Sequence, residues 1–459
     1  MEFEISKKLL VISSPKIRGW VWALEYSHLM ASKGWQVDYL DTTSKARNNK
    51  ILNKSLVEKK IFLQFKSQSE KITNRSRKVS QVFVFIHSLM IVLKFFYFKS
   101  SSEYFLNRNI PIERLLYSNM SRWYGTFYLD ISKISKHNSF LIIKELINTL
   151  YCVRRYLDEH GKPDLICTPN GRDATGTAAY SLAKLNGIPF NTLELGFQEF
   201  TWEEYKVSPH YPQTWWTKLL KCKKNLATNN EIASFWKSRL EGNDYFVERN
   251  WRSYYKNGYL PINNKSNYKL VSFFTSSTHE IPVWKDFLNN SILFDDQFTA
   301  VEEILKVCRE QKFTLVIRRH PNSISTYGED TEADLWERFA KSPGVIYFGP
   351  NSKVDSHVLI RQSSVVLCHD SSIGVEALRM NVPAYTTGSP FWAIDPKNRI
   401  KTKKDLESAI KKPILLDNGV TDSWASLHLT KSNRIKLFKF TEAALAVFDD
   451  IPVFYRSSI

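Results

Sequence analysis

The feature that most constrains the fold is a regular alternation of apolar runs and amphipathic stretches in the second half of the chain. It begins at KLVSFF (269–274) and continues to VPAYTT (382–387), with short apolar runs separated by stretches of helical periodicity. Repeated strand-then-helix units of this length predict a doubly wound α/β domain built on a parallel sheet.

The start of the chain predicts a second domain of the same class. KKLLVISS (7–14) is typical of a buried strand, residues 20–34 of a helix, and WQVDYLD (35–41) of a second strand. The short connections imply parallel strands. The turn after the first strand lacks GxGxxG, so no dinucleotide cofactor is expected. After an irregular, basic and aromatic stretch (about 43–138), the alternation resumes.

The length of 459 residues is too great for one ordinary core and suits two domains of ~200 residues each. A polar stretch (255–268) is typical of an interdomain linker. We therefore expect an N-terminal domain over 1–260 that carries the 43–138 insertion, and a C-terminal domain over 261–435. A C-terminal helix is expected over 436–459, packing back on the N-terminal domain.

The net charge of +18 is concentrated in one segment. Between Lys45 and Lys78 eleven basic residues face only Glu58 and Glu70, an excess of nine. Such a run could meet nucleic acid, an anionic membrane or a phosphorylated substrate, or it could be a solvated basic loop. Zinc-finger, homeodomain and RNP patterns do not accompany it, so a nucleic-acid partner is not expected.

One apolar segment, VFVFIHSLMIVLKFFYF (82–98), has to be tested as a membrane span. Its seventeen residues are near the lower limit for crossing a bilayer, and His87, Ser88 and Lys94 interrupt it. We expect a buried helix, with a helix in the membrane interface as the alternative. Five cysteines without a CxxC pair, and no recognisable signal peptide, favour a cytoplasmic protein with at most peripheral contact with the membrane.

Polar clusters follow three of the expected strands in the second half. They are TSSTHE (275–280), RRHPN (318–322) and HDSSIG (369–374). Ligands of doubly wound sheets bind outside the carboxyl ends of the strands, where loops and helix N-termini gather, so we expect these clusters to converge.

The last cluster can be interpreted as a phosphate site or as an ordinary helix cap. Ser371 or Ser372 as the N-cap, with Gly374 in the first turn, would leave backbone N–H groups facing outward. Glu376 lies four residues after Ser372, so it does not complete a capping box with that serine. It would lie one turn along the same face, where a carboxylate can accept both hydroxyls of a ribose.

His320 ends an expected strand and precedes Pro321, which stops the ladder. An imidazole beside Arg318 and Arg319 suits a phosphate, because it can donate a hydrogen bond or a proton to a leaving group.

RRHPN, followed by SSIGVEALRMNVPAYTTG, resembles the paired HP and S-S-x-G-x-E-A-L-x-x-x-x-P motifs of bacterial capsular polysaccharide biosynthesis proteins. That family includes Kdo transferases, and it is similar to GT-B sialyltransferases that use CMP-sugars and to CDP-glycerol glycerophosphotransferases. The resemblance covers roughly Lys269 to Gly388. It implies a GT-B fold, in which two Rossmann-like doubly wound domains face a cleft.

The resemblance also implies roles for individual residues. His320 would contact the donor phosphate and assist the leaving group, Ser371 and Ser372 would bind the phosphate, and Glu376 the ribose. The remaining members of the implied donor site are Ser276, Ser277, Arg318 and Gly374. His369 and Asp370 stand where the family has small or apolar residues, and their role is left open. Since adjacent strand residues point to opposite sides, we expect neither metal nor cofactor.

The catalytic base of a GT-B enzyme is expected in the N-terminal domain. Asp173 in PNGRDATG and Glu194 in LELGFQE both follow expected strands. Arg172 would favour the ionised form of Asp173, although Asp173 could equally be the cap of the next helix. Outside candidates are Glu25 and His210. Acceptor-binding residues are expected at Arg172, Trp202 and His210, the last two in an aromatic stretch that could also be a packed loop.

The sequence thus predicts a metal-independent, inverting glycosyltransferase of capsule or lipopolysaccharide biosynthesis. Its donor would be CMP-Kdo or another CMP-sugar, and its acceptor a glycan or glycolipid. A UDP-sugar glycosyltransferase and a CDP-polyol phosphotransferase are alternatives. Alternatives of another class are a catalytically silent nucleotide-sugar-binding scaffold and a UDP-GlcNAc 2-epimerase-like enzyme.

Overall fold

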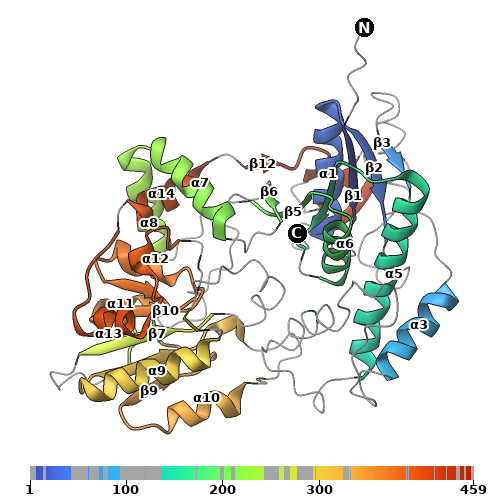
Figure 1. The fold of residues 1–459 in the computed structure, drawn as a ribbon. Coiled ribbons are helices and arrows are strands. Elements are labelled where there is room, and N and C mark those ends of the chain that lie inside the picture. The colour runs from blue at the N-terminus through green and yellow to red at the C-terminus, as the bar shows by residue number, and fades with distance from the viewer. Residues whose placement is uncertain are drawn as a thin grey trace.

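The computed structural model describes residues 7–13, 17–42, 60, 72–75, 81–93, 119, 136–171, 173–196, 201–207, 212–241, 258–262, 269–276, 293–294, 296–323, 330, 332–388, 390, 392–417, 419–430, 432–440, 445–448 and 451–455. Within them the helices and strands form two α/β domains, one around each of two large sheets (Figure 1).

The N-terminal sheet has seven strands in the order β12-β6-β5-β4-β1-β2-β3. Neighbours from β5 to β3 are parallel, and β6 and β12 extend the sheet with antiparallel pairs. The strands are β1 (Lys8–Ile12), β2 (Gln36–Leu40), β3 (Ile72–Asn74), β4 (Leu165–Pro169), β5 (Phe190–Leu195), β6 (Thr201–Lys206) and β12 (Asn433–Arg434).

Both faces of this sheet are covered, because successive side chains of β1 enter different cores. Leu9 and Val11 pack with α1 (Ile17–Ser32), whereas Leu10 and Ile12 pack with α5 (Lys136–His160) and α6 (Ala174–Leu185). Helices on both faces of a mostly parallel sheet define a doubly wound domain.

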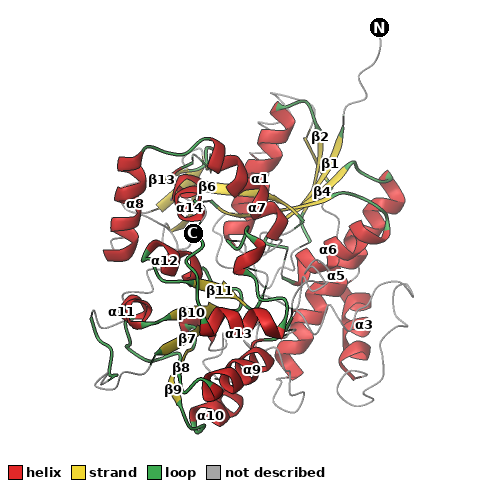
Figure 2. Cartoon of the chain, turned by 60° about the vertical axis from the view of Figure 1, so that its left-hand side comes forward, coloured by secondary structure: helices red, strands yellow, loops and turns green. Residues whose placement is uncertain are grey.

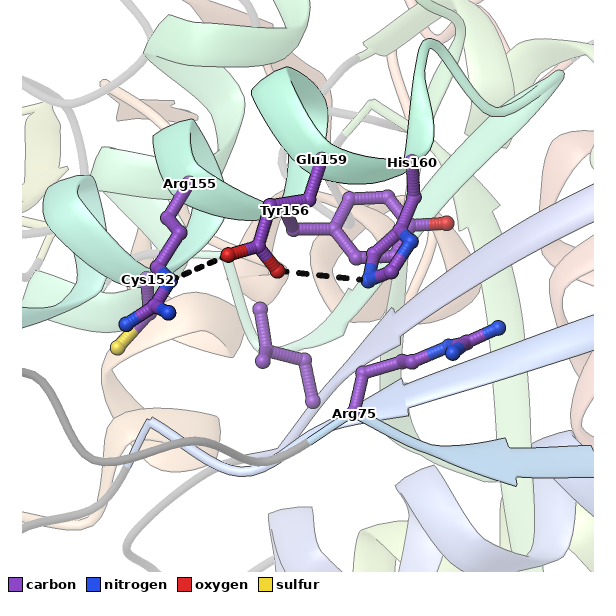
Figure 3. Close-up of a pocket in the computed structure, with 7 residues that line it drawn as sticks. Arg75, Cys152, Arg155, Tyr156, Glu159 and His160 are labelled. Carbon is purple, nitrogen blue, oxygen red and sulfur yellow. Dashed lines mark hydrogen bonds and ion pairs between the residues drawn. The ribbon is translucent and has the colours of Figure 1, made fainter.

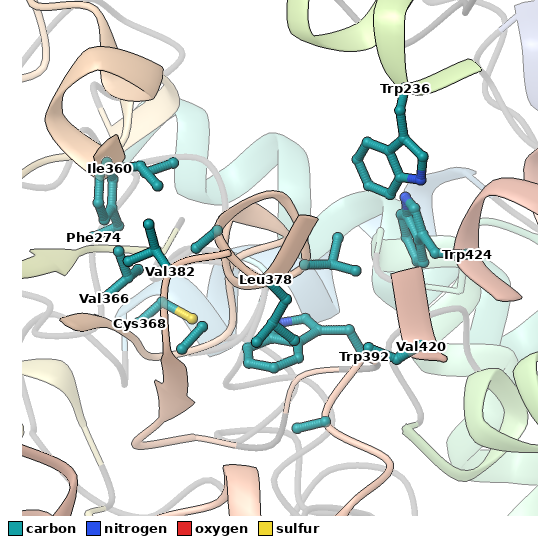
Figure 4. Close-up of a cluster of buried hydrophobic side chains, with 14 of the residues drawn as sticks. Trp236, Phe274, Ile360, Val366, Cys368, Leu378, Val382, Trp392, Val420 and Trp424 are labelled. Carbon is teal, nitrogen blue, oxygen red and sulfur yellow. The ribbon is translucent and has the colours of Figure 1, made fainter. Parts of the chain in front are cut away.

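The C-terminal sheet has five parallel strands in the order β11-β10-β7-β8-β9. They are β7 (Leu270–Phe274), β8 (Thr314–Arg318), β9 (Val345–Phe348), β10 (Val365–Cys368) and β11 (Ala384–Thr386). Val271 and Phe273 of β7 face one core, while Leu270 and Phe274 face the other, part of which Figure 4 shows. The helices are α9 (Gln297–Glu310), α10 (Ala333–Ala340), α11 (Ser356–Gln362), α12 (Ile373–Arg379), α13 (Lys403–Lys411) and α14 (Val420–Leu429).

The chain passes between the domains more than once. After β6, helices α7 (Pro212–Lys224) and α8 (Asn229–Glu241) fall within 1–260, which the sequence assigned to the N-terminal domain, yet they pack in a core of the C-terminal domain. Trp215 of α7 stacks on Trp424 of α14, with 5.7 Å between ring centroids. After α14 the chain returns as β12 and pairs with β6 of the N-terminal sheet.

The helix expected over 436–459 is wrong. The described residues there form strands β13 (Lys439–Phe440), β14 (Leu445–Phe448) and β15 (Ile451–Tyr455), which make a small antiparallel sheet. Pro452 cannot continue a helix, and the β-branched and aromatic residues around it favour strands.

The residues before this small sheet pack on the N-terminal domain. Phe438 is buried with its ring centroid 5.6 Å from that of Trp20. Glu25 Oε1 accepts hydrogen bonds from the backbone N–H groups of Lys436 and Leu437, at 2.7 and 2.6 Å. Glu25, an outside candidate for the base, therefore holds the returning chain.

The apolar segment expected to be a buried helix is buried on one face only. Its described part is α3 (Gln81–Leu93), which packs against α5. Val84, Ser88 and Ile91 are buried, but Phe85, Ile86 and other apolar side chains are exposed. In the part of the chain that the structure describes, no helix has the length and apolar character needed to cross a bilayer.

Candidate functional site

The candidate site lies at the carboxyl ends of β7, β8 and β10. Strand order reverses between β7 and β10, since the chain first adds β8 and β9 on one side and then β10 and β11 on the other. Such a switch point is where doubly wound domains bind ligands. The Asp370 N–H donates to Ser276 Oγ at 2.7 Å, and the His320 N–H donates to Thr275 Oγ1 at 2.8 Å. The expected convergence of the three polar clusters is therefore present.

His369 ties this site to the loop after β11. Its side chain is buried, Nδ1 lies 3.0 Å from Thr387 Oγ1, and its carbonyl accepts from Thr386 Oγ1 at 2.6 Å. A Cβ on Gly388 would lie 2.5 Å from the His369 carbonyl and 2.6 Å from Asp370 Oδ1. The side chain of His369, whose role the sequence left open, thus fixes the path of the loop.

The start of α12 differs from the serine cap considered in the sequence. Ser372 is the N-cap residue but has helical backbone angles and makes no side-chain cap bond, whereas Ser371 Oγ accepts from Ile373 N at 3.3 Å. Trp392 Nε1 donates to the Ser371 carbonyl at 2.9 Å. A Cβ on Gly374 would lie only 2.1 Å from the Trp392 ring, so the glycine makes room for an indole.

The two arginines beside His320 are buried in structural contacts. Arg318 Nη1 donates to the carbonyls of Arg319 and Gly349, at 2.8 and 2.6 Å. Arg319 forms a bidentate pair with Asp330, at 2.5 and 2.9 Å. The structure thus gives Arg318, a predicted donor-binding residue, a role in holding the loop after β9. His320 itself is half-buried.

Glu376 lies in a buried cluster where α12 meets α8 and α11. Its Oε1 is 2.9 Å from Arg239 Nη2 of α8, and its Oε2 is 2.8 Å from His357 Nε2 of α11. Burial alone would raise the pKa of this carboxyl, but the charge of Arg239 and the hydrogen bond from His357 outweigh it and lower the pKa to about 2. Neither partner was predicted from the sequence, because Arg239 lies 137 residues away from Glu376 and His357 is on another helix.

In the N-terminal domain, Asp173 is both the helix cap and a base candidate. Oδ1 accepts from Gly176 N at 2.9 Å at the start of α6, as the cap interpretation predicts. Oδ2 is enclosed, and none of the residues that the structure describes donates a hydrogen bond to it. An enclosed oxygen without a partner is unusual.

Glu194 is already bound to a neighbour that the sequence analysis did not single out. Asn170 Nδ2 donates to Glu194 Oε1 at 2.5 Å, and Asn170 has a φ of 63°. A non-glycine residue in this left-handed region is uncommon and needs support from its surroundings. The signal was present in the PNGRD turn, because Asn tolerates this conformation better than most residues.

The expected acceptor wall is not formed by Trp202. This residue is 2% exposed and packs edge-on against Tyr26, with 5.7 Å between ring centroids. Its indole belongs to the core under the N-terminal sheet, because strand β6 directs it inward. Ser277, Arg172 and His210 lie outside the described residues.

Described residues line cavities of very different size. One of about 10 Å³, roughly the room for one water molecule, lies beside α5 and is lined by Arg75, Tyr156 and His160 among others (Figure 3). The other, of about 630 Å³, lies between α7 and the loop around Trp392 and is lined by Leu220, Lys223, Trp392, Ile394, Asp395, Pro396, Asn398, Asp417, Val420 and Ser423. Because Trp392 also bonds to Ser371, this larger cavity adjoins the start of α12.

No group of three His, Cys, Asp or Glu side chains that could hold a metal ion occurs among the residues described. Metal independence stays a prediction. The five cysteines are free thiols.

The two doubly wound domains, joined by a chain that crosses between them, give this protein the GT-B architecture expected from the sequence. No protein-family model matches the chain, and no curated protein does so. Solved structures that the chain matches include the KpsC β-Kdo 2,4-transferase of Thermosulfurimonas dismutans, at 13% identity over 58% of this chain and 80% of that one, with a TM-score of 0.35. The UDP-GlcNAc 2-epimerase of Neisseria meningitidis bound to UDP-GlcNAc is 12% identical over 92% of this chain and 94% of that one, with a TM-score of 0.31.

Proposed function

We propose that this protein is a glycosyltransferase of surface polysaccharide biosynthesis that takes its sugar from a nucleotide donor. A CMP-sugar such as CMP-Kdo is the favoured donor, and a glycan or glycolipid is the acceptor. The observation that carries the proposal is the junction at the switch point of the C-terminal sheet, where Ser276 meets Asp370 and Thr275 meets His320. Polar loops gathered at that edge suit a phosphorylated ligand.

On the donor side, half-buried His320 is the group proposed to meet the phosphate and assist the leaving nucleotide. A hydrogen bond to Thr275 fixes the backbone of His320, so its ring starts from a defined position beside the end of β7. An imidazole can donate a hydrogen bond or a proton to a phosphate oxygen. Ser371 and Ser372 are proposed to complete the phosphate site.

The proposed role of Glu376 in binding ribose has to coexist with its ion pair. A carboxylate offers about four acceptor positions. Arg239 and His357 each occupy part of this capacity in Glu376. A ribose hydroxyl would therefore add to the cluster, and it would find the carboxylate ionised because its pKa is about 2.

For the catalytic base we propose Asp173 rather than Glu194. Inverting transfer needs a group that accepts the proton of the attacking hydroxyl. None of the described residues donates a hydrogen bond to Asp173 Oδ2, whereas Glu194 is held by Asn170. The cap bond through Oδ1 would at the same time hold the carboxylate in place.

The test is nucleotide binding followed by product analysis. Thermal shift with CMP, CDP, UDP and GDP reports binding, since a ligand that binds only the folded state raises the apparent stability. We expect CMP to give the largest shift, and His320→Ala and Ser276→Ala to remove most of it. A preference for UDP would point to a UDP-sugar transferase, and free sugar released from UDP-GlcNAc to an epimerase. Binding without turnover on any acceptor would indicate a scaffold.

A further inference from the structure

Helix α3 is apolar apart from Gln81, His87 and Ser88. Its sequence, QVFVFIHSLMIVL, contains no Asp, Glu, Lys or Arg. At 3.6 residues per turn, Val84, Ser88 and Ile91 fall on one side of the helix, and these three are buried. Ser88 is also satisfied within the helix, because its Oγ donates to the Val84 carbonyl at 2.6 Å. This side packs against α5.

The rest of the helix surface carries large apolar residues that are partly exposed, although the rings of Phe83 and Phe85 also contact Tyr151 and Phe140 of α5. Phe85, Ile86 and Leu89 are 47, 48 and 41% exposed, and Leu141 at the start of α5 is 38% exposed. A surface helix of a globular domain normally has polar residues opposite its buried stripe. The other exposed large apolar residues of the described chain are spread over several elements, so this concentration marks an interaction surface. We call Phe83, Phe85, Ile86, Leu89 and Leu141 the α3 patch.

The position of the patch leaves it accessible. Figures 1 and 2 both show α3 on the outer side of α5, away from the C-terminal domain. The candidate donor site is in that other domain, so a partner on the α3 patch would leave the donor site open.

The charges that flank α3 in the sequence indicate that its partner is negatively charged. The run from Lys45 to Lys78, with its excess of nine positive charges, comes directly before this helix, and Lys94 and Lys99 follow it. Basic segments next to an apolar helix are attracted to anionic lipid headgroups.

We propose that the α3 patch docks on the surface of an anionic lipid bilayer, with the helix lying in the plane of the interface. Phe85, Ile86 and Leu89 enter the boundary between headgroups and acyl chains, and the positive charge of the flanking sequence favours an anionic surface. The proposal does not depend on the glycosyltransferase assignment. An enzyme held in this way would meet acceptors that are anchored in the same bilayer.

The test is co-sedimentation of the full chain with vesicles of phosphatidylcholine alone or with about one-third phosphatidylglycerol. We expect binding to the mixed vesicles only, weakening as NaCl rises from 50 to 500 mM, because salt screens charges at the surface. The double variant Ile86→Asn, Leu89→Asn should bind about tenfold more weakly. The matched control is Ile414→Asn, Leu415→Asn, an exposed pair in the C-terminal domain whose change should leave binding intact.

Three results would overturn the proposal. The first is failure to bind mixed vesicles by a protein that a cooperative thermal melt shows to be folded. The second is equal binding to neutral vesicles, because the proposed surface is anionic. If the chain instead self-associates in analytical ultracentrifugation, and the Ile86, Leu89 variant abolishes that, the patch is covered by a second copy of the chain. Loss of nucleotide binding with vesicle binding retained would count against the proposed function alone.

Discussion

Arg239 on α8 and Glu376 on α12 form a buried ion pair, with 2.9 Å between Nη2 and Oε1, and so join two helices 137 residues apart in sequence. Helix α8 follows the first passage of the chain between the domains, and α12 follows the turn that carries Ser371. The pair therefore fixes α8 to α12, the helix that starts next to the candidate donor site.

Removing the arginine should be costly. Arg239→Met leaves a buried carboxylate with His357 as its remaining ionic partner, and we expect the free energy of unfolding in urea to fall by about 3 kcal/mol. As a control, Lys341→Met breaks a pair with Glu337 that is exposed on both sides, and it should cost under ~0.5 kcal/mol. Similar losses in the two variants would show that the buried pair has no special role.

The burial of Glu25 predicts an unusual dependence of stability on pH. Desolvation raises its pKa from 4.5 to about 7, although the N–H groups of Lys436 and Leu437 act against the shift. A carboxyl with a raised pKa in the folded state stabilises the fold at low pH, and this contribution is lost as pH rises from about 4.5 to 7. Both N–H groups donate to Oε1, so Gln can replace Glu without losing them.

Glu25→Gln should therefore be more stable than wild type at pH 8, by about 2 kcal/mol, and nearly equal to it at pH 4.5. Urea unfolding at the two pH values measures the difference. Glu25→Leu, which removes the acceptor, should be destabilised at both. A constant difference between wild type and Glu25→Gln across this range would mean that the carboxyl titrates as in water.

Substitutions of Asp173 can distinguish the cap formed by one carboxylate oxygen from the proposed base function of the other. Asn caps helices as well as Asp, so Asp173→Asn should keep the free energy of unfolding within about 0.5 kcal/mol. The same change removes the proposed base, and we expect the turnover number to fall 10²-fold or more. Asp173→Ala should lose activity as well and also about 1 kcal/mol of stability. Full activity in Asp173→Asn would exclude the residue as base and direct attention to Glu194.

Gly374 has no room for a side chain. In Gly374→Ala the new methyl group would meet the Trp392 ring at 2.1 Å, and we expect a loss of about 2 kcal/mol from overpacking despite the better helix propensity of alanine. The measurement is urea unfolding, together with nucleotide binding. Gly349→Ala, where the nearest atom would be 3.7 Å away, is the matched control. Adding Trp392→Leu to Gly374→Ala should recover part of the loss, and its failure to do so would mean that the contact is relieved elsewhere.

The fold class followed from the sequence because hydrophobic periodicity is a local signal. The expected strands KLVSFF and KKLLVISS became β7 and β1, and the GT-B arrangement of two doubly wound domains is confirmed. The expected terminal helix was wrong because apolar runs of a few residues suit either helix or strand, and Pro452 disfavours a helix at that point.

The site was harder to predict because side-chain partners are long-range. That Ser276 and Asp370 meet could be inferred, since parallel strands end at one edge. That Glu376 would find Arg239 and His357 could not, because these partners depend on how three helices pack. The cap of Asp173 and its proposed role as base could not be separated in the sequence, because the two would use different oxygens of one carboxylate.

The return of the chain to the first sheet has a consequence for biosynthesis. The N–H groups that bind Glu25 are 411 and 412 residues further along the chain, and Trp20 packs against Phe438. At typical translation rates, Lys436 is synthesised roughly 20–80 s after Glu25. During that time the first domain lacks Phe438 in its core and lacks the backbone N–H groups that bind Glu25 in the folded protein. The two domains therefore reach their final state together, rather than in the order in which they are synthesised.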